Sequence, residues 1–335
     1  MTVIVLGDFF LDRYFEIDGE LAERSVETGL TAHQVTGLRL SPGAAGTVVS
    51  NLRALGVGRV VCLGVIGVDG EGFELKRALT RMGADPSELI EREDRFTPCY
   101  SKPMLRENGV ERELERLDIK NRSLLASDVE ETVIARLDAL ISRVDGVIIA
   151  DQVQERNCGV VTDRVREAVA RIAAGYPEKV FFADSRIRIA EFTEVIVKPN
   201  KFEAVDAVRG KARVDGAAEH VAEFTIEEAK DCARALRERT HRPVFMTAQE
   251  DGIFVVDDSV IHVPSVRVTG EIDPVGAGDS CAAGIVSALC AGASNGEAAL
   301  VGNIVASITV KKLGQTGTAS PEEVLARFDE FGLGG

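Results

Sequence analysis

Short runs of β-branched and other apolar residues recur along the chain, and they constrain its fold more than any other feature. The runs are TVIVL at 2–6, RVVCLGVI at 59–66, GVIIA at 146–150, KVFFA at 179–183, EVIVK at 194–198 and PVFMT at 243–247. Segments with helical periodicity lie between several of them, at 127–141, 158–173 and 226–239. Nearly continuous apolar strands are typical of sheets that are covered on both faces. The pattern therefore predicts an α/β fold with a doubly wound, mostly parallel sheet flanked by helices, in which ligands bind at the carboxyl ends of the strands.

Two segments interrupt this rhythm, at residues 13–40 and 97–119. They alternate polar and apolar residues, and the second contains the hairpin-like RENGVER turn. We expect them to form antiparallel strands outside the main sheet, as a small β-sheet lid; an edge hairpin without functional consequence is the alternative. The carboxyl third predicts three successive helices, at 277–291, 295–312 and 321–331. No internal repeat or linker divides the chain, so residues 1–335 are expected to form a single domain.

The net charge of −15, from 39 basic and 54 acidic residues, excludes proteins that bind through a broad basic surface. Its field repels nucleic acid and anionic membranes, so neither is expected as a partner, and an anionic ligand needs local donors. The amino terminus lacks a signal-peptide pattern, and the longest apolar run, at 281–293, is too short to span a bilayer. Six scattered cysteines without a CxxC pair are expected to be reduced, which predicts a cytoplasmic protein. Four histidines without metal-ligand spacing argue against a zinc enzyme.

The stretch EIDPVGAGDS, at 271–280, places acids around a glycine turn directly before an apolar helix. Gly276 and Gly278 allow a sharp turn, and the helix that follows begins with unsatisfied N–H groups. Together with the helix dipole, these groups predict an anion hole suited to phosphate. Asp279 is then either an N-cap or first-turn acid of the helix, or a general base, with the amides of Ala277, Gly278 and Asp279 stabilising a transferring phosphoryl group. The absence of a GxGxxG fingerprint and of a P-loop disfavours an NAD-dependent oxidoreductase and a P-loop enzyme.

DPVGAGDS resembles the carboxyl-terminal signature of the ribokinase-like, or PfkB, carbohydrate kinases, Asp-Thr-x-Gly-Ala-Gly-Asp. Further segments resemble those of the family in the same order: LGDFFLD, SPGAAGTVVSNLRALG, GVIGVDGEG and VKPNKFEA. The similarity covers essentially the whole chain. GDFFLDRY, RELERLD and IVASITVKKLGQTGTASPEEV bring it closest to the heptose-phosphate kinase branch. Because the chain ends at Gly335, we expect it to lack the nucleotidyltransferase module that is fused in that branch.

The resemblance implies that Asp279 is the catalytic base and that Gly276, Ala277 and Gly278 form the anion hole. The residues implied to bind the sugar are Asp12, Asp8, Gly43, Ala44 and Thr47. Ala44 replaces the second glycine of the family's Gly-Gly pair, and Thr47 replaces an asparagine, so the contacts to the sugar must differ. For Asp12, a carboxylate with up to four acceptor sites, a surface ion pair is the alternative.

The resemblance also implies a nucleotide site. Its residues are Asn200, Thr247 and Asn303. Glu203 is implied to organise Mg²⁺ through water, and Asp273 occupies the place of a monovalent cation ligand in many relatives. The alternatives are a proline turn that opens a helix for PNKFEA, a turn cap for Asp273 and a solvated helix face for Asn303. Gln249 stands where glycine is common, and Pro274 where the signature has threonine.

These implications predict transfer of phosphate from ATP, with Mg²⁺ and in some relatives K⁺, to a hydroxyl of a sugar or sugar phosphate. A phosphorylated substrate needs cationic clamps, for which the candidates are Arg186, Arg188 and Arg116. Exposed lid strands pair between subunits in the lid-bearing branches, so a homodimer through these strands is expected. Alternatives of the same class are a fructokinase, a ribokinase or a 2-keto-3-deoxygluconate kinase. A noncatalytic sugar or nucleotide sensor on the same fold is the alternative from a different class.

Overall fold

The computed structural model describes residues 1–107, 109–210, 223–314 and 316–330. Within these residues, nine strands form the main sheet, in the order β14-β13-β12-β11-β10-β9-β1-β4-β5. They are β1 (Thr2–Gly7), β4 (Arg59–Gly67), β5 (Leu89–Arg92), β9 (Gly146–Asp151), β10 (Val180–Ser185), β11 (Ile196–Val197), β12 (Val244–Thr247), β13 (Ile253–Val256) and β14 (Val260–Val263). Neighbours are parallel from β5 to β12 and antiparallel at β13 and β14. This confirms the predicted doubly wound, mostly parallel sheet.

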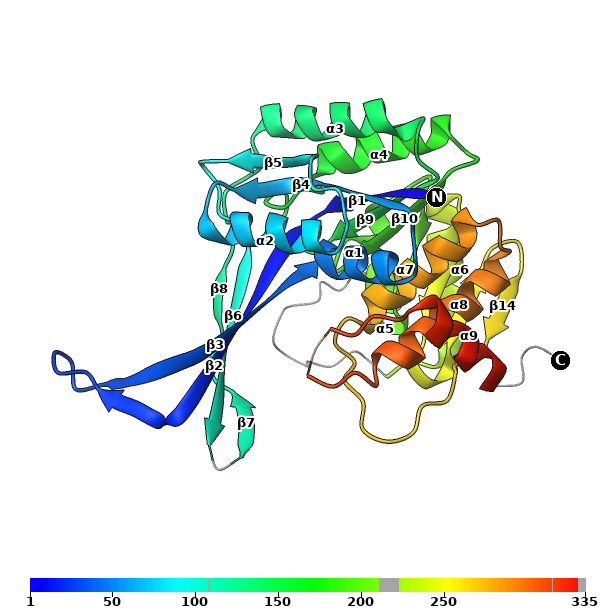
Figure 1. Cartoon of the computed structure of the whole chain (residues 1–335). Coiled ribbons are helices and arrows are strands. Elements are labelled where there is room, and N and C mark those ends of the chain that lie inside the picture. The colour runs from blue at the N-terminus through cyan, green and yellow to red at the C-terminus, as the bar shows by residue number, and fades with distance from the viewer. Residues whose placement is uncertain (108, 211–222, 315, 331–335) are drawn as a thin grey trace.

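Helices cover both faces of this sheet (Figure 1). On one face lie α3 (Ser127–Ile141), α4 (Asp163–Gly175), α5 (Lys201–Arg209) and α6 (Ile226–Thr240). On the other lie α1 (Ala45–Ala54), α2 (Gly70–Arg81), α7 (Ala277–Cys290) and α8 (Asn295–Thr309), with α9 (Pro321–Glu330) against α8. In β1, Ile4 and Leu6 enter one hydrophobic core while Val3 and Val5 enter the other. Because successive side chains of a strand point to opposite faces, a strand between two cores must be apolar throughout.

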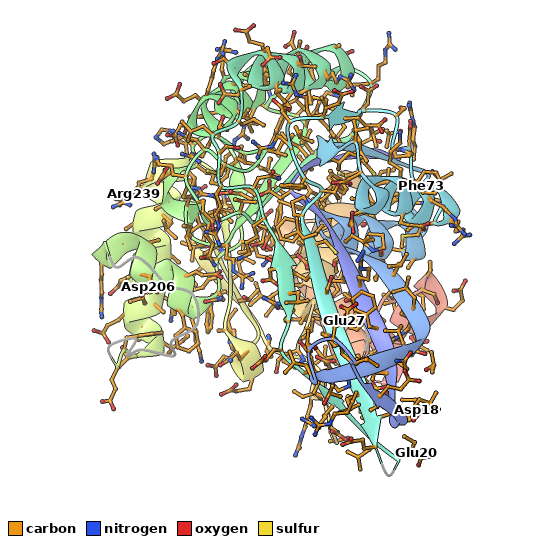
Figure 2. All side chains as sticks on the ribbon, turned by 90° about the vertical axis from the view of Figure 1, so that its left-hand side faces the viewer. Asp18, Glu20, Glu27, Phe73, Asp206 and Arg239 are labelled. Carbon is orange, nitrogen blue, oxygen red and sulfur yellow. The ribbon has the colours of Figure 1, made fainter. Side chains whose placement is uncertain are left out.

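A second sheet contains β2 (Phe9–Arg24), β3 (Thr31–Ala44), β6 (Cys99–Glu107), β7 (Val110–Glu113) and β8 (Leu117–Ile119). It projects from the main body in Figure 1, and Asp18, Glu20 and Glu27 mark its outer part in Figure 2. One detail of the expectation is wrong: β2 and β6 are parallel, whereas the other strand pairs of this sheet are antiparallel. Parallel neighbours need a long connection, and the chain between β2 and β6 provides one by passing through β3, β4 and β5.

The predicted helix at 158–173 begins later than expected, at Asp163. Thr162 is its N-cap, and the Thr162 hydroxyl accepts a hydrogen bond from the Val165 N–H at 3.2 Å. The sequence does not predict β5, β13 and β14, which are strands of four residues at the two edges of the sheet. The last residue of the predicted final helix, Phe331, lies outside the described residues.

All six cysteines are free thiols, and five of them are buried. All but Cys158 pack in or against the two hydrophobic cores, as expected for cysteines that behave as small hydrophobic residues. No described helix is both long and apolar enough to cross a bilayer.

Helix α7 begins at the glycine turn. Gly276 is its N-cap residue and adopts the left-handed conformation, with φ 79° and ψ 2°. A Cβ atom at Gly276 would lie 2.5 Å from Cγ2 of Thr316, whereas a Cβ atom at Gly278 would lie 3.5 Å from Nζ of Lys198, an ordinary contact distance. Backbone conformation and close packing therefore both require glycine at position 276.

We expect Gly276→Ala to lower the free energy of unfolding by about 1–3 kcal/mol, because alanine adopts a left-handed conformation less readily than glycine. Gly278→Ala is the matched control. It lies in a helical turn with room for a methyl group, so its stability should stay the same or rise by up to about 1 kcal/mol. Urea unfolding followed by circular dichroism measures both, and equal stabilities of the two variants would contradict the prediction.

Candidate active site

Charged side chains gather at the carboxyl edge of the main sheet. They are Asp8 after β1, Asp151 at the end of β9, Asp184 and Arg186 at the end of β10, and Lys198 after β11. The strands are parallel, so their carboxyl ends meet at one edge, where ligands bind in sheets of this kind. Asp279, in the first turn of α7, and Asp12, in β2, lie close enough to this group for their charges to interact.

Asp279 is half-buried, and the pKa of its carboxyl group is raised from 3.8 to about 7. The causes, largest first, are burial and the charge of Asp184, which raise it, Lys198 and Arg186, which lower it, and Asp12, which raises it. Gly276 is the N-cap of α7 and no side chain caps the helix there, so Asp279 is not the N-cap, but it does lie in the first turn of the helix. The result is a carboxyl group that exchanges its proton near neutral pH.

The amides of the glycine turn are not equivalent. The Ala277 N–H donates to the Pro274 carbonyl oxygen at 3.1 Å and so closes the turn. The next two N–H groups, of Gly278 and Asp279, lie in the first turn of α7, where amides have no intrahelical acceptor. Of the three amides expected to bind an anion, those of Gly278 and Asp279 can therefore donate to it, whereas that of Ala277 already donates within the turn.

Lys198 and Asp184 form a buried ion pair beside the turn, which the sequence analysis did not single out. Nζ and Oδ2 are 2.9 Å apart, and the side chains are 5% and 14% exposed. Burial, the largest single effect, disfavours a charged lysine, but the charges of Asp184, Cys281 and Glu203 and the hydrogen bond to Asp184 together outweigh it, so the pKa of Lys198 is raised. The sequence does contain a signal for this pair, because a charged residue stands at the carboxyl end of each of the two apolar runs that form β10 and β11.

Asp12 lies in β2 and pairs with Lys102 of β6, with Nζ and Oδ1 3.1 Å apart and side chains 13% and 14% exposed. Lys102 also donates to the Tyr14 hydroxyl at 3.1 Å. A Cβ atom at Gly43 would lie 2.6 Å from Oδ2 of Asp12, so the Asp12 carboxylate rests against the glycine backbone. This pair is largely buried, unlike the surface ion pair that was the alternative for Asp12.

Asp8 serves as a backbone clamp. Its carboxylate accepts hydrogen bonds from the N–H groups of Gln152 and Val153, both at 2.9 Å, and of Val160 at 2.8 Å. Burial, and then the charge of Asp151, raise the pKa of Asp8 to about 6 against these bonds. A carboxylate has about four acceptor sites, so little of its capacity is left for a ligand. The sequence could not reveal this role because the partners lie far along the chain.

The two departures from the family's Gly-Gly helix have visible consequences. Ala44, the N-cap residue of α1, has φ 53° and ψ −119°, a conformation that glycine adopts far more readily. Thr47 is buried, and its Cγ2 would lie 3.4 Å from a Cβ atom at Gly276. Thr47 therefore presents a methyl group to the glycine turn.

Asn200 and Glu203 form a reciprocal capping box at the start of α5. The Asn200 side chain accepts from the N–H groups of Phe202 and Glu203, and Glu203 Oε2 accepts from the Asn200 N–H at 2.8 Å. The helix-opening turn that was the alternative for this segment is therefore present. The Thr247 N–H donates to the Pro199 carbonyl oxygen at 3.0 Å, which brings the end of β12 beside the same turn.

Two other predicted residues hold backbone segments. The Asn303 side chain donates to the carbonyl oxygens of Val263 and Pro264, both at 3.0 Å, and is buried instead of solvated. Asp273 accepts from the Val275 N–H at 3.0 Å, as a turn cap does, and from the Gly314 N–H at 3.1 Å. Asp273 thus ties the glycine turn to the loop that follows α8.

A cavity of about 380 Å³ opens between the small sheet and the carboxyl edge of the main sheet. Its cationic lining residues are Arg95, Arg116, Lys120 and Arg186. Arg116 bonds to Asp118 at 2.6 and 2.8 Å and lies over the Tyr100 ring, 4.4 Å from its centre. The third candidate clamp, Arg188, is buried and pairs with Asp151 at 2.8 Å, so it supports the segment that lines the cavity.

The described part of the chain contains no cluster of three or more His, Cys, Asp or Glu side chains able to hold a metal ion. Such a cluster is not required for Mg²⁺, which keeps several waters and binds through one or two carboxylates plus substrate phosphates. Glu203, whose charge acts on Lys198, supplies a carboxylate of this kind at this edge of the sheet.

Two solved structures share this architecture. The Arabidopsis thaliana ribokinase complexed with ribose and ATP has a TM-score of 0.67 at 18% identity, over 97% of both chains. Phosphofructokinase-2 from Escherichia coli, in complex with substrates and products, has a TM-score of 0.69 at 16% identity, over 99% of both chains. At such identities the likeness establishes the ribokinase-like fold alone.

Sequence relatives add the family. The bifunctional protein HldE of Geotalea uraniireducens is 31% identical over 98% of this chain, and that of Wolinella succinogenes is 28% identical over 96%. The chain spans 63% and 64% of the length of these two relatives. Residues 17–323 match the pfkB family carbohydrate kinase. The chain therefore belongs to the PfkB family of carbohydrate kinases.

Proposed function

We propose that this protein transfers the terminal phosphoryl group of ATP to a hydroxyl group of a sugar phosphate. The observation that carries the proposal is the position of Asp279, whose pKa is raised to about 7, in the first turn of a helix that begins at a glycine turn. A base beside anion-binding amides is what attack of an alcohol on a phosphoryl group requires. The ribokinase neighbour that holds ribose and ATP supports the choice of nucleotide.

In this proposal Asp279 accepts the proton of the acceptor hydroxyl while the hydroxyl oxygen attacks the terminal phosphorus. The bond from phosphorus to the bridging oxygen of ADP breaks, and the N–H groups of Gly278 and Asp279 donate to the phosphate oxygens. The positive end of the α7 dipole stabilises the charge that develops there. Because the pKa of Asp279 is about 7, about half of the group is carboxylate at neutral pH, and it can hold a proton after transfer.

The nucleotide side of the proposed site comprises Asn200, Thr247 and Asn303, whose bonds shape the backbone around it. Glu203 would hold Mg²⁺ through water. When bound, Mg²⁺ neutralises charge on the phosphate oxygens. Asp273 would support a monovalent cation beside the glycine turn.

This assignment is tested by comparing the activity in K⁺ with the activity in an organic cation at the same ionic strength.

On the acceptor side, Asp12 and Lys102 offer an acceptor and a donor for sugar hydroxyls beside the backbone of Gly43. Arg186 connects this region to the cavity, because it lines the cavity and its charge also acts on Asp279. Cationic side chains at the cavity wall suit a second anionic group on the acceptor, and phosphate pairs well with arginine. A sugar phosphate fits these features better than a neutral sugar does.

The small sheet serves in this proposal as a lid over the acceptor, which limits access of water to the phosphoryl group. It exposes several large apolar side chains, namely Leu21, Val26, Leu30, Val35 and Leu38. Exposed apolar strands favour pairing with a second chain, so we propose that two lids meet in a homodimer.

We expect Asp279→Asn to lower kcat by about 10² or more, because a general base contributes about 10² to 10⁴. In the unaltered protein, kcat/KM should fall about tenfold for each pH unit below 7, since protonation removes the base, and should level off above 7. Coupled ADP release between pH 5.5 and 8.5 measures both. Asp138→Asn, at an exposed position of α3, is the matched control and should keep full activity. Near-normal turnover of Asp279→Asn would remove Asp279 from this role.

Lys120→Met and Arg116→Met should raise KM for the sugar phosphate about 10- to 100-fold, as expected for the loss of a charge-assisted hydrogen bond. KM for the matching sugar without phosphate should change little. The measurement uses pentoses, hexoses and heptoses with and without a terminal phosphate. Arg106→Met, an exposed arginine of the same small sheet, is the control. Equal effects on both forms of one sugar would argue against phosphate recognition in the cavity.

Light scattering after size exclusion should give the mass of a dimer instead of the 35.9 kDa of one chain. Val35→Glu with Leu38→Glu should produce monomers, because two charges on β3 oppose burial of the lid surface. A monomeric unaltered protein at micromolar concentration would contradict the proposed dimer.

A further inference from the structure

Lys198 and Asp184 form a buried ion pair beside the glycine turn, and the proposed reaction assigns no role to this pair. Lys198 follows β11 and Asp184 lies in the neighbouring strand β10, so the two side chains leave adjacent parallel strands at the same edge. Lys198 N–H also donates to the Ala183 carbonyl oxygen at 3.0 Å, which holds its backbone against β10. The lysine is therefore fixed from both ends of its side chain.

Stability alone does not account for this pair. Removing two charges from water is costly, and replacing a buried ion pair by apolar residues of similar size is often neutral or stabilising. Buried apolar residues lie on the neighbouring elements, since Phe182 of β10 and Cys281 and Ala282 of α7 belong to one hydrophobic core. Apolar side chains would fill this space without the cost of burying two charges. The pair is better explained by its position than by the stability it contributes.

That position is defined by the turn above it. A Cβ atom at Gly278 would lie 3.5 Å from Nζ of Lys198, so the ammonium group lies beside Gly278, whose amide is proposed to bind phosphate. The charged and titratable groups that act on it from the surrounding elements are Asp184 of β10, Glu203 of α5 and Cys281 of α7. Its own charge acts on Asp279. An ammonium group has three N–H donors, so contact with one carboxylate oxygen does not exhaust it.

We propose that the Lys198 ammonium group contacts the phosphoryl group during transfer, and that Asp184 acts as a positioning residue that holds the lysine in place. The inference rests on the proposed function. During transfer the acceptor oxygen bonds to phosphorus, the bond to the ADP bridging oxygen breaks, and the acceptor proton passes to Asp279. Lys198 keeps its protons throughout and donates N–H bonds to nonbridging phosphate oxygens, whose charge it balances in a site screened from water.

The first test measures kcat on the alkaline plateau of each variant's pH profile, because loss of Lys198 raises the pKa of Asp279 above its value of about 7. Lys198→Met should lower kcat by about 10² or more, the size of effect seen when one donor to a developing anion is removed. Lys198→Arg keeps a cation and should recover part of the loss. KM for the acceptor should stay nearly unchanged in both variants, because the ammonium group lies on the phosphate side of the site.

Lys198→Met leaves Asp184 buried without a partner and could prevent folding. The double variant Lys198→Met with Asp184→Asn removes both charges and keeps the side-chain volumes, so it should fold with a melting temperature close to that of the unaltered protein. Its kcat should equal that of Lys198→Met. Asp184→Asn alone should lower kcat less, and it should have no further effect once Lys198 is absent. Additive losses would show that Asp184 acts independently of the lysine.

The pH profile of Asp184→Asn is a second measurement, and replacement of a residue that served only the fold would leave this profile unchanged. The charges that face Asp279 are those of Asp184, Lys198, Arg186 and Asp12. Loss of the negative charge of Asp184 favours the Asp279 carboxylate, so the acid limb of kcat/KM should move to lower pH. Loss of Lys198 in the double variant should return the limb towards that of the unaltered protein.

Nucleotide binding tests the same inference without an acceptor. With Mg²⁺, the double variant should bind the nonhydrolysable analogue AMP-PNP about tenfold more weakly or worse, as expected for one lost charge-assisted bond, while ADP binding should change little. Lys179→Met, which alters a lysine at the amino end of β10, is the matched control for turnover and binding.

If the unaltered protein phosphorylates no acceptor, the proposed function fails. If it is active and Lys198→Met turns over equally fast, only the role of Lys198 fails.

Discussion

Burial of the parallel sheet on both faces is the constraint on which the rest of the molecule depends. With hydrophobic cores on either side of β1, charged groups can approach the sheet only at the ends of its strands. The carboxyl ends of β1, β9, β10 and β11 consequently bring together acids and bases that lie far apart in the sequence. The small sheet leaves the main body at the same edge, because β2 continues directly from β1.

At that edge of the sheet, the balance of charges sets the pKa of Asp279. Asp279 is surrounded by two acids that raise its pKa and two cations that lower it, and burial tips the balance towards a value near 7. The pair of Lys198 and Asp184 contributes one charge of each sign. This balance keeps the site close to neutral, which the proposed binding of phosphate requires in a chain that carries a net charge of −15.

Several residues that the family pattern assigns to ligands also shape the backbone that surrounds the ligand. Asp8 clamps the segment that lines the cavity, Asn200 caps α5, and Asn303 holds the end of β14. The sequence pattern identified these positions because it records residue type and spacing. It could not separate contact with a ligand from support of the backbone, since both uses favour the same short polar side chains.

The sequence by itself determined the alternation of buried strands and helices, the second sheet and the glycine turn with Asp279, because these depend on local periodicity and on the conformations open to glycine. Edge strands such as β5 and β14 are too short to leave such a signal, and the parallel pairing of β2 with β6 depends on a distant segment. Only the tertiary structure brought Lys198 to Asp184, Lys102 to Asp12 and Arg116 to the cavity. Ion pairs between separate strands follow from how the chain folds back on itself, and no spacing along the sequence records that geometry.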